Sequence, residues 1–330
     1  MPNEKIEQNK VIVEELEKDL KSCKENAQFN KAVEICEKLV FEYDYFGYRF
    51  ELPELYNRAN LYGKTIDFLN SWMAEAENSE ILLLMTSPFL FLGDAYFKIG
   101  NTVKAIESYN IIISLEEEQI KKIPDRADIN DKKLMIAIAN TRIGEVYYKG
   151  NNFIEARKCF QSASQSAPYI VAICYIAHMC YYGQAFEKDI ETAISIYEDI
   201  VDADFGMDEE FANCVKKANY ELGMIFATEN GYKDKEKALL RLNKAKELGH
   251  KITDSEISSI INNIVDDEPL NDNSCSAKRL PMVLNVLIII FIAVGVISLF
   301  GGSPMVFWIC ILLLIIFIII KKIVNKINKN

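Results

Sequence analysis

The chain has 330 residues, 37 Lys and Arg against 48 Asp and Glu, and a formal net charge of −11 at pH 7. Six of the basic residues follow Asp272, the last acidic residue, so the stretch up to Asp272 has 31 basic and 48 acidic side chains, a net charge of −17. Such an acidic body repels phosphate backbones, which excludes nucleic acid as the expected partner.

The eight cysteines contain no CxxC pair and fall at apolar helical positions or in the tail. The first residues, MPNEKIEQNK, lack the apolar core of a signal peptide. Both features predict a body kept in the reducing cytosol, where free Cys behaves as a small hydrophobe. Few glycines, prolines and β-branched runs before residue 281 predict an all-α fold.

The first two predicted hairpins keep the apolar spacing of paired helices. The first pair is carried by Leu16, Leu20, Cys23, Phe29, Ala32, Cys36 and Leu39. The second runs from Leu55 to Tyr62 and from Ile66 to Glu75, and we expect Gly63 to split it.

A pattern of small and large residues then occurs twice, about fifty residues apart. Its copies are Leu92, Gly93, Tyr96, Gly100, Ala105, Tyr109 and Ile112, then Ile143, Gly144, Tyr147, Phe153, Ala156, Phe160, Ala163 and Pro168. Each copy predicts two antiparallel helices, with Gly144 and Ala156 small where the helices cross and large rings beside the crossing. We expect Gly150 to end the first helix in the left-handed conformation and Asn151 or Asn152 to cap the second.

The stretches LGDAYFKIGNTVKAIESY and IGEVYYKGNNFIEARKCFQSASQSAP resemble the tetratricopeptide repeat. Two later stretches, IAHMCYYGQAFEKDIETAISIYEDI and ANYELGMIFATENGYKDKEKALLRLNKAKELG, resemble the related Sel-one-like repeat. In the first of these, Ala177 and Cys180 depart from the usual glycine and tyrosine. The resemblance implies a stack of helical hairpins that binds other proteins.

A closing helix is predicted from Asp254 to Val265, with Thr253 and Glu256 as a capping box. Together these elements predict about six helical hairpins stacked as a right-handed superhelical solenoid, a repeat domain over residues 1–268.

The tail predicts a membrane hairpin. After a polar linker (269–281) come two apolar segments, 282–300 and 305–320, joined by a GGSP turn and followed by a basic tail, 321–330. Because basic residues flank the hairpin and none lies in the turn, the positive-inside rule places the repeat domain and the C-terminus in the cytoplasm of a two-span membrane protein. A hairpin that dips into one leaflet, or one buried in a soluble core, stays an alternative.

Little in the sequence predicts chemistry. It has none of the motifs GxxxxGK[ST], GxSxG or HExxH, and only two histidines. Cys174 and His178 lie four residues apart on one helical face near Cys180, but three candidates without a fourth ligand or an orienting residue predict neither a zinc site nor a nucleophile. We therefore expect no catalytic residues, no cofactor, no metal and no enzymatic activity.

The first helix of each hairpin is expected to line the concave face of the stack and to bind a partner. Helical spacing projects these residues onto that face: Leu90, Asp94, Phe97, Thr141, Glu145, Tyr148, Cys174, His178, Tyr181, Tyr220 and Met224. Tetratricopeptide domains that grip acidic chaperone tails share a lysine, asparagine and arginine clamp, and only Arg142 matches it here. Because Asp94 and Glu145 would repel an acidic tail, we expect a neutral or basic protein or peptide.

The sequence therefore predicts a membrane-anchored adaptor or scaffold whose groove holds a partner protein, with the lipid bilayer as a second partner. Two alternatives stay open. The C-terminal hairpin could be the active element, shaping a membrane or joining a membrane complex, with the repeats as its regulator. The other is a Sel-one-like hydrolase.

Overall fold

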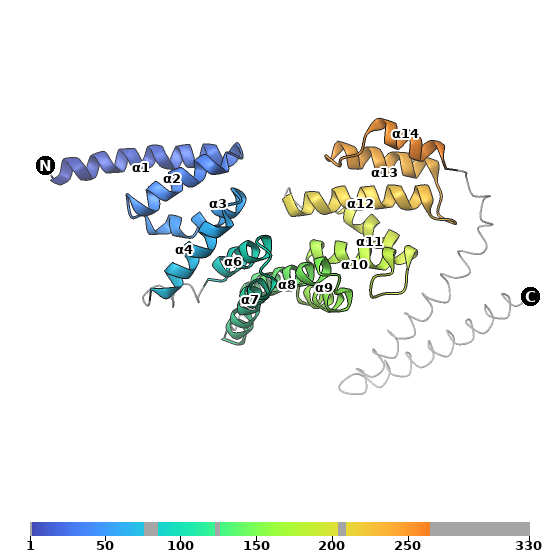
Figure 1. Cartoon of the computed structure of the whole chain (residues 1–330), viewed down its shortest axis with the longest axis horizontal. Coiled ribbons are helices and arrows are strands. Elements are labelled where there is room, and N and C mark those ends of the chain that lie inside the picture. Colours follow the sequence, from blue (N-terminus) through green and yellow to red (C-terminus); the bar gives the residue numbers. More distant parts are fainter. Residues whose placement is uncertain (1, 76–84, 123–125, 204–208, 265–330) are drawn as a thin grey trace, which may run out of the picture. The chain divides into compact units, whose positions relative to one another are not determined.

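The computed structural model describes residues 2–75, 85–122, 126–203 and 209–264 (Figure 1). Within these ranges every regular element is helical, as predicted. The helices are α1 (Pro2–Glu25), α2 (Phe29–Phe41), the short 3-10 helix η1 (Phe46–Arg49), α3 (Leu52–Arg58), α4 (Tyr62–Ala74), α6 (Ser87–Lys98), α7 (Thr102–Lys122), α8 (Arg126–Lys149), α9 (Phe153–Ser166), α10 (Ile170–Tyr182), α11 (Ile190–Asp202), α12 (Glu209–Thr228), α13 (Lys235–Glu247) and α14 (Asp254–Asn262).

The chain divides into two compact units. The first comprises Met1–Gly223 and Leu239–Ile257, and the second comprises Met224–Ala238 and the chain from Ser258 onward. The first unit holds α1 to α11 with the first part of α12, and it contains the candidate site described below.

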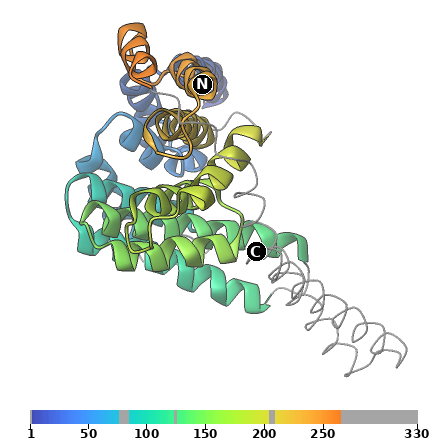
Figure 2. The same ribbon diagram turned by 90° about the vertical axis from the view of Figure 1, so that its right-hand side faces the viewer.

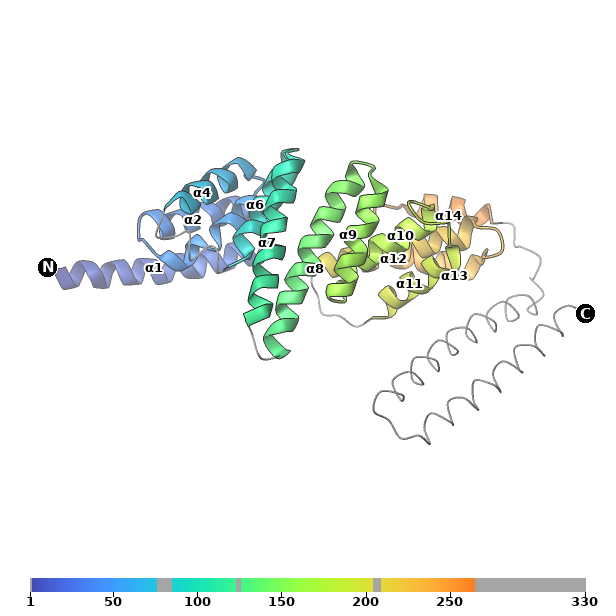
Figure 3. The same ribbon diagram turned by 90° about the horizontal axis from the view of Figure 1, so that it is seen from below.

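Consecutive helices of the first unit pack as antiparallel pairs: α1 with α2, α3 with α4, α6 with α7, α8 with α9, and α10 with α11. Neighbouring pairs also touch, so that α7, α8 and α9 lie side by side (Figures 2 and 3). Each pair buries its apolar stripe against the next one instead of around a single centre. The predicted succession of helical hairpins is confirmed, while the handedness of the stack stays a prediction.

The small residues lie at the helix crossings. A Cβ atom built on Gly144 of α8 would come within 2.6 Å of the Phe160 ring of α9. A Cβ on Gly223 of α12 would lie 2.7 Å from Leu242 of α13, and Gly93 of α6 is covered as closely by the Tyr109 ring of α7. A glycine at these three positions thus lets a large side chain lie directly on the partner helix.

Two turns differ from the prediction. At the end of α8 the left-handed residue is Asn151, with φ of 58°, and Gly150 keeps a negative φ. The Asn152 side chain then caps α9 by accepting a hydrogen bond from the Glu155 amide at 3.4 Å. Gly63 does not split the second hairpin, because it lies in the first turn of α4. The turn there is made by Asn60, with φ of 60°. Asparagine tolerates this conformation better than most residues with a side chain, so either residue type suits such a turn.

At the other end of the chain, the capping box before α14 is confirmed. The Glu256 amide donates to Thr253 Oγ1 at 3.2 Å, and the Thr253 amide donates to Glu256 Oε2 at 2.7 Å. The linker 269–281, the apolar segments 282–300 and 305–320 and the basic tail lie outside the described residues, so their boundaries stay predictions. None of the helices in the described part of the chain is long and apolar enough to cross a membrane.

Candidate functional site: a groove lined by first helices

A groove of about 590 Å³ crosses the first unit. Its walls come from the first helix of five successive hairpins, α3, α6, α8, α10 and α12, and from the first residue of α4. The lining residues are Glu54, Asn57, Arg58, Tyr62, Leu90, Phe91, Asp94, Phe97, Lys98, Arg142, Glu145, Lys149, Tyr175, Glu209, Glu210 and Asn213. Aromatic rings and charges of both signs therefore line one surface.

Helical spacing explains which side chains reach the groove. On α8 the lining residues are Arg142, Glu145 and Lys149, which lie three and four positions apart and so share one face. Glu145 directly follows the crossing glycine of its helix, and Asp94 does the same on α6. The residue after that glycine lines the groove on both helices.

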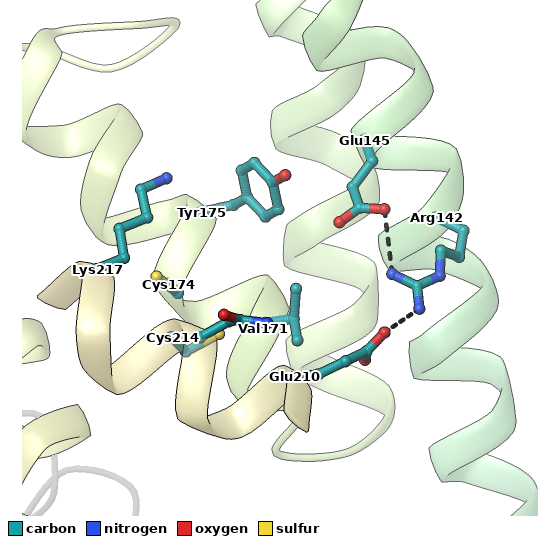
Figure 4. A pocket seen from close by; sticks show the side chains of 9 residues that line it. Arg142, Glu145, Val171, Cys174, Tyr175, Glu210, Cys214 and Lys217 are labelled. Atoms are coloured by element: carbon teal, nitrogen blue, oxygen red, sulfur yellow. Dashed lines mark hydrogen bonds and ion pairs between the residues drawn. The ribbon is translucent and has the colours of Figure 1, made fainter. Parts of the chain in front are cut away.

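Arg142 lies at the centre of a cluster of three carboxylates from three helices. Its Nη1 lies 3.2 Å from Glu145 Oε2, and its Nη2 donates to Glu210 (Figure 4). Its Nε lies 3.6 Å from Asp94 Oδ1. The hydroxyl of Tyr109 also donates to Asp94, at 2.7 Å. We call Asp94, Arg142, Glu145 and Glu210 the arginine cluster. It holds more negative than positive charge.

Burial raises the pKa of Asp94 and of Glu145, although the Arg142 guanidinium acts in the opposite direction on both. For Glu210, burial alone would raise the pKa, but Arg142 and the hydrogen bonds from Tyr169 and Arg142 together lower it. The Arg142 guanidinium thus outweighs burial at Glu210 but not at Asp94 and Glu145. An additional cation close by would favour their charged forms.

A side pocket of about 210 Å³ adjoins the groove and shares five lining residues with it. Val171 and the thiols of Cys174 and Cys214 give it an apolar lining, and Lys217 lies on the opposite side from Arg142 (Figure 4). The Lys217 ammonium lies 5.2 Å from the centre of the Tyr175 ring. Apolar and charged surfaces thus meet in a space large enough for one side chain.

A row of basic residues borders the groove. Arg58, Lys98 and Lys149 each lie in the last turn of their helices, α3, α6 and α8. Cations are favoured there by the helix dipole. The Lys149 ammonium lies 4.3 Å from the centre of the Phe97 ring, so it is held over an aromatic surface of the groove. We call Arg58, Lys98 and Lys149 the basic row.

The structure brings only part of the predicted binding set together. Leu90, Asp94, Phe97 and Glu145 line the groove, and Cys174 lines the side pocket. Met224 belongs to the second unit and is not placed relative to them.

The other predicted residues lie elsewhere in the first unit. Thr141 is fully buried, and its hydroxyl donates to the Ala137 carbonyl, so it belongs to the interior of α8 and not to the groove. Tyr181 is buried as well, because its side of α10 faces the core. The Tyr220 ring stacks on His250, with 4.1 Å between ring centres.

Tyr148 and His178 form a second polar cluster with Tyr182, Gln184 and Glu221, which we call the histidine cluster. The Tyr148 hydroxyl lies 3.1 Å from His178 Nδ1 and donates to Gln184 at 2.8 Å, and Tyr182 donates to Glu221 at 3.2 Å. Burial and the nearby charge of Lys217 lower the pKa of His178 to about 4. His178 is therefore neutral at pH 7, and its neighbours hold it as part of the packing.

Sequence reasoning missed the basic row and the α12 side of the groove. On that side Glu209 and Glu210 line the groove, and Glu210 binds Arg142. A charged residue at the start of a helix gives no signal of what lies opposite it, because Arg142 and Glu210 are 68 positions apart. Among the described residues, no group of three or more His, Cys, Asp and Glu side chains could hold a metal ion.

The chain matches no protein-family model and no curated protein sequence. Its structure is similar to that of the MamA protein, with 16% identity and a TM-score of 0.41 over 59% of this chain and 97% of the other. It is also similar to the apo form of the quorum sensor NprR from B. thuringiensis (15% identity, TM-score 0.43, 75% and 84% covered). A third similar structure is c5321, an SLR-fold protective antigen of uropathogenic Escherichia coli strains. Its sequence identity is 14% and its TM-score is 0.33, over 72% of this chain and 61% of the other. At these TM-scores the likenesses add nothing to the fold that the helical hairpins show.

Proposed function

We propose that this protein is a helical-repeat scaffold that binds a segment of a partner protein in the groove. The observation that carries the proposal is that the first helices of five successive hairpins supply nearly the whole groove lining. A surface assembled in this way extends across several repeats and suits an elongated ligand. Its aromatic rings provide contact area at low cost in conformational entropy, and its charges can fix the orientation of the segment.

The best candidates for catalysis support a binding role instead. Cys174 is only 3% exposed, and burial keeps the His178 imidazole uncharged within the histidine cluster. Neither residue presents a reactive atom to the groove. We therefore propose a scaffold without enzymatic activity of its own.

The groove proposal is tested with a phage-displayed library of random peptides and the full-length chain. Asn213 is exposed on the α12 side of the groove, so Asn213→Trp fills the groove without disturbing the core. Asn110, exposed on the second helix α7, provides the matched control Asn110→Trp. We expect peptides enriched by the wild type to bind Asn110→Trp equally and to lose most of their affinity for Asn213→Trp. Equal binding to both variants would refute the groove.

The scaffold is proposed to be tethered to a membrane by the two segments 282–300 and 305–320, with the repeat domain and the C-terminus on the cytoplasmic side. The apolar length of the segments and the basic residues that flank them support this. The full-length chain should remain with the membrane fraction after extraction at alkaline pH. A doubly substituted chain with one charge in each segment, Ile289→Lys with Leu313→Lys, should leave that fraction, because each charge in the bilayer core costs about 3 kcal/mol. Retention of that variant would contradict the tether.

A further inference from the structure

The charges of the groove are arranged in two parallel rows. One row is formed by the carboxylates of Asp94, Glu145 and Glu210, with Arg142 between them, and the other is the basic row defined above. Arg58 of the basic row is already paired with Glu54, another lining residue, at 2.8 Å, so Lys98 and Lys149 are the members of that row that carry the proposal. On α6 the acidic and basic positions are 94 and 98, and on α8 they are 145 and 149. A separation of four residues places the two charges on one face, about 6 Å apart along the helix axis.

The fold explains why the two rows of charge repeat from helix to helix. Asp94 and Glu145 each follow a crossing glycine, and Lys98 and Lys149 each end the helix one turn later. Because successive hairpins use the same crossing, equivalent positions line up across α6 and α8. A ligand that crosses the first helices therefore meets negative charge along one edge and positive charge along the other.

An extended peptide presents its side chains alternately to its two sides. A chain lying along the groove between the rows would turn every second side chain toward the carboxylates and the others toward the basic row. Resting on the proposed function of the groove, we propose that the bound segment is extended and alternates basic and acidic side chains. Its basic side chains bind the carboxylates beside Arg142, and its acidic side chains bind the basic row.

The state of the arginine cluster agrees with this occupant. Asp94, Glu145 and Glu210 share the Arg142 guanidinium, so the arginine cluster contains more carboxylates than cations. The side pocket lies next to Glu145 and Glu210 and can take the aliphatic stem of a lysine or arginine against Val171 and Cys174. On the other edge, the Lys149 ammonium lies over the ring of Phe97, which also lines the groove.

The proposal is tested by fluorescence anisotropy with three capped peptides and the full-length chain. The first peptide alternates Arg and Glu around a central Leu, the second has the same composition with Arg and Glu in separate blocks, and the third replaces every charge by Gln. We expect the alternating peptide to bind at least about tenfold tighter than either of the others, because only it matches both rows at once. Equal affinities of the alternating and the block peptide would overturn the proposal.

A double charge reversal tests which row of charges binds the acidic side chains of the peptide and which binds the basic ones. Lys98→Glu with Lys149→Glu turns the basic row acidic at two exposed positions. Affinity for the alternating peptide should fall at least about tenfold, while an all-basic peptide should gain. The matched control Lys31→Glu with Lys121→Glu changes the net charge equally at exposed positions of α2 and α7, and should leave the preference unchanged. If the control changes the peptide preference to the same extent, the affinity depends on the net charge of the protein and not on the position of the charges, and the proposal fails.

The two proposals fail in distinguishable ways. If Asn213→Trp abolishes binding of library peptides but the alternating peptide has no advantage, the groove stands and the charge pattern is wrong. If Asn213→Trp does not weaken the binding of any peptide, the groove is not the binding site, and the proposed charge pattern is refuted as well.

Discussion

The arginine cluster and the histidine cluster are built largely on the same helices and yet differ in charge. Arg142 and Glu145 of α8 belong to the first, and Tyr148, one turn further along α8, belongs to the second. The Asp94 and Glu210 side chains are 29% and 39% exposed, whereas those of Glu221 and His178 are 7% and 17% exposed. Arg142 and Glu145 are as buried as His178, and Tyr182 is exposed, so the contrast lies in which titratable groups face a ligand. We call the arginine cluster, with two carboxylates on the groove, the open cluster, and the histidine cluster, whose titratable groups are covered, the closed cluster.

The difference shows how burial decides the role of a polar group in this fold. In the closed cluster, burial lowers the pKa of His178 to about 4 and raises the pKa of Glu221, so both groups are pushed toward their neutral forms. In the open cluster a full guanidinium charge is retained among carboxylates. We therefore assign only stability to the closed cluster, and binding as well as stability to the open one.

The largest effect is expected from Gly144→Val, because α8 supplies residues to both clusters. The new side chain would collide with the Phe160 ring, which lies within 2.6 Å of an added Cβ. We expect a loss of about 3 kcal/mol in the free energy of unfolding, measured by urea denaturation. Gly63→Ala is the control, since nothing lies within 4 Å of its added Cβ, and it should leave the protein as stable or slightly more so. A harmless Gly144→Val would show that the crossing is not tight.

Arg142→Gln should destabilise the protein by about 2 kcal/mol at pH 7, because it leaves three partly buried carboxylates without their cation. The loss should shrink as the pH falls from 7 to 5. The pKa values of Asp94 and Glu145 are already raised and will rise further, so the folded variant takes up protons that the unfolded chain does not. Urea denaturation at several pH values measures this. A loss that grows on acidification would contradict the account of the open cluster.

His178 should give a pH dependence of the opposite sign. Its pKa is about 4 in the folded state and about 6.5 when unfolded, so stability is present above pH 6.5 and is lost as the pH falls. Between pH 7 and pH 5 this histidine should cost roughly 1.5 to 2 kcal/mol. His178→Asn should remove that part of the pH dependence. Comparison with His250→Asn separates the two histidines, since the pKa of His250 is also lowered by burial. An unchanged slope in His178→Asn would mean that the imidazole is not held neutral.

The smallest effect is expected from Lys149→Met in the basic row. The ammonium over Phe97 is an exposed cation–π contact, worth about 0.5 kcal/mol. Thermal unfolding should therefore change little, as it should for Lys121→Met on α7. A loss several times larger would show that the basic row is needed for folding and would weaken its assignment to binding.

The fold was largely predictable, because its signals are local. Gly144 and Phe160 are sixteen positions apart within one hairpin, and their spacing recurs at Gly93 and Tyr109. The turns were less predictable, since asparagine and glycine both tolerate the left-handed conformation that Asn151 adopts.

The site was only partly predictable. Helical projection gives the face of a helix but not the depth of each residue on it, which is why Asp94 lies in the groove while Thr141 is buried. The partner of Arg142 could not be found from sequence, because Glu210 reaches it from a different hairpin. The basic row was missed for another reason. Lysines at helix ends are common on any protein surface, and only the structure shows that Lys98 and Lys149 line the same groove.

Hydrogen–deuterium exchange of the full-length chain, with and without the alternating peptide, tests most directly whether the first helices bind the partner. We expect slower exchange in α6, the second half of α8 and the start of α12 when the peptide is bound, with no change in α7, α9 and α11. Protection confined to the second helices, or exchange that the peptide leaves unchanged throughout, would contradict this expectation.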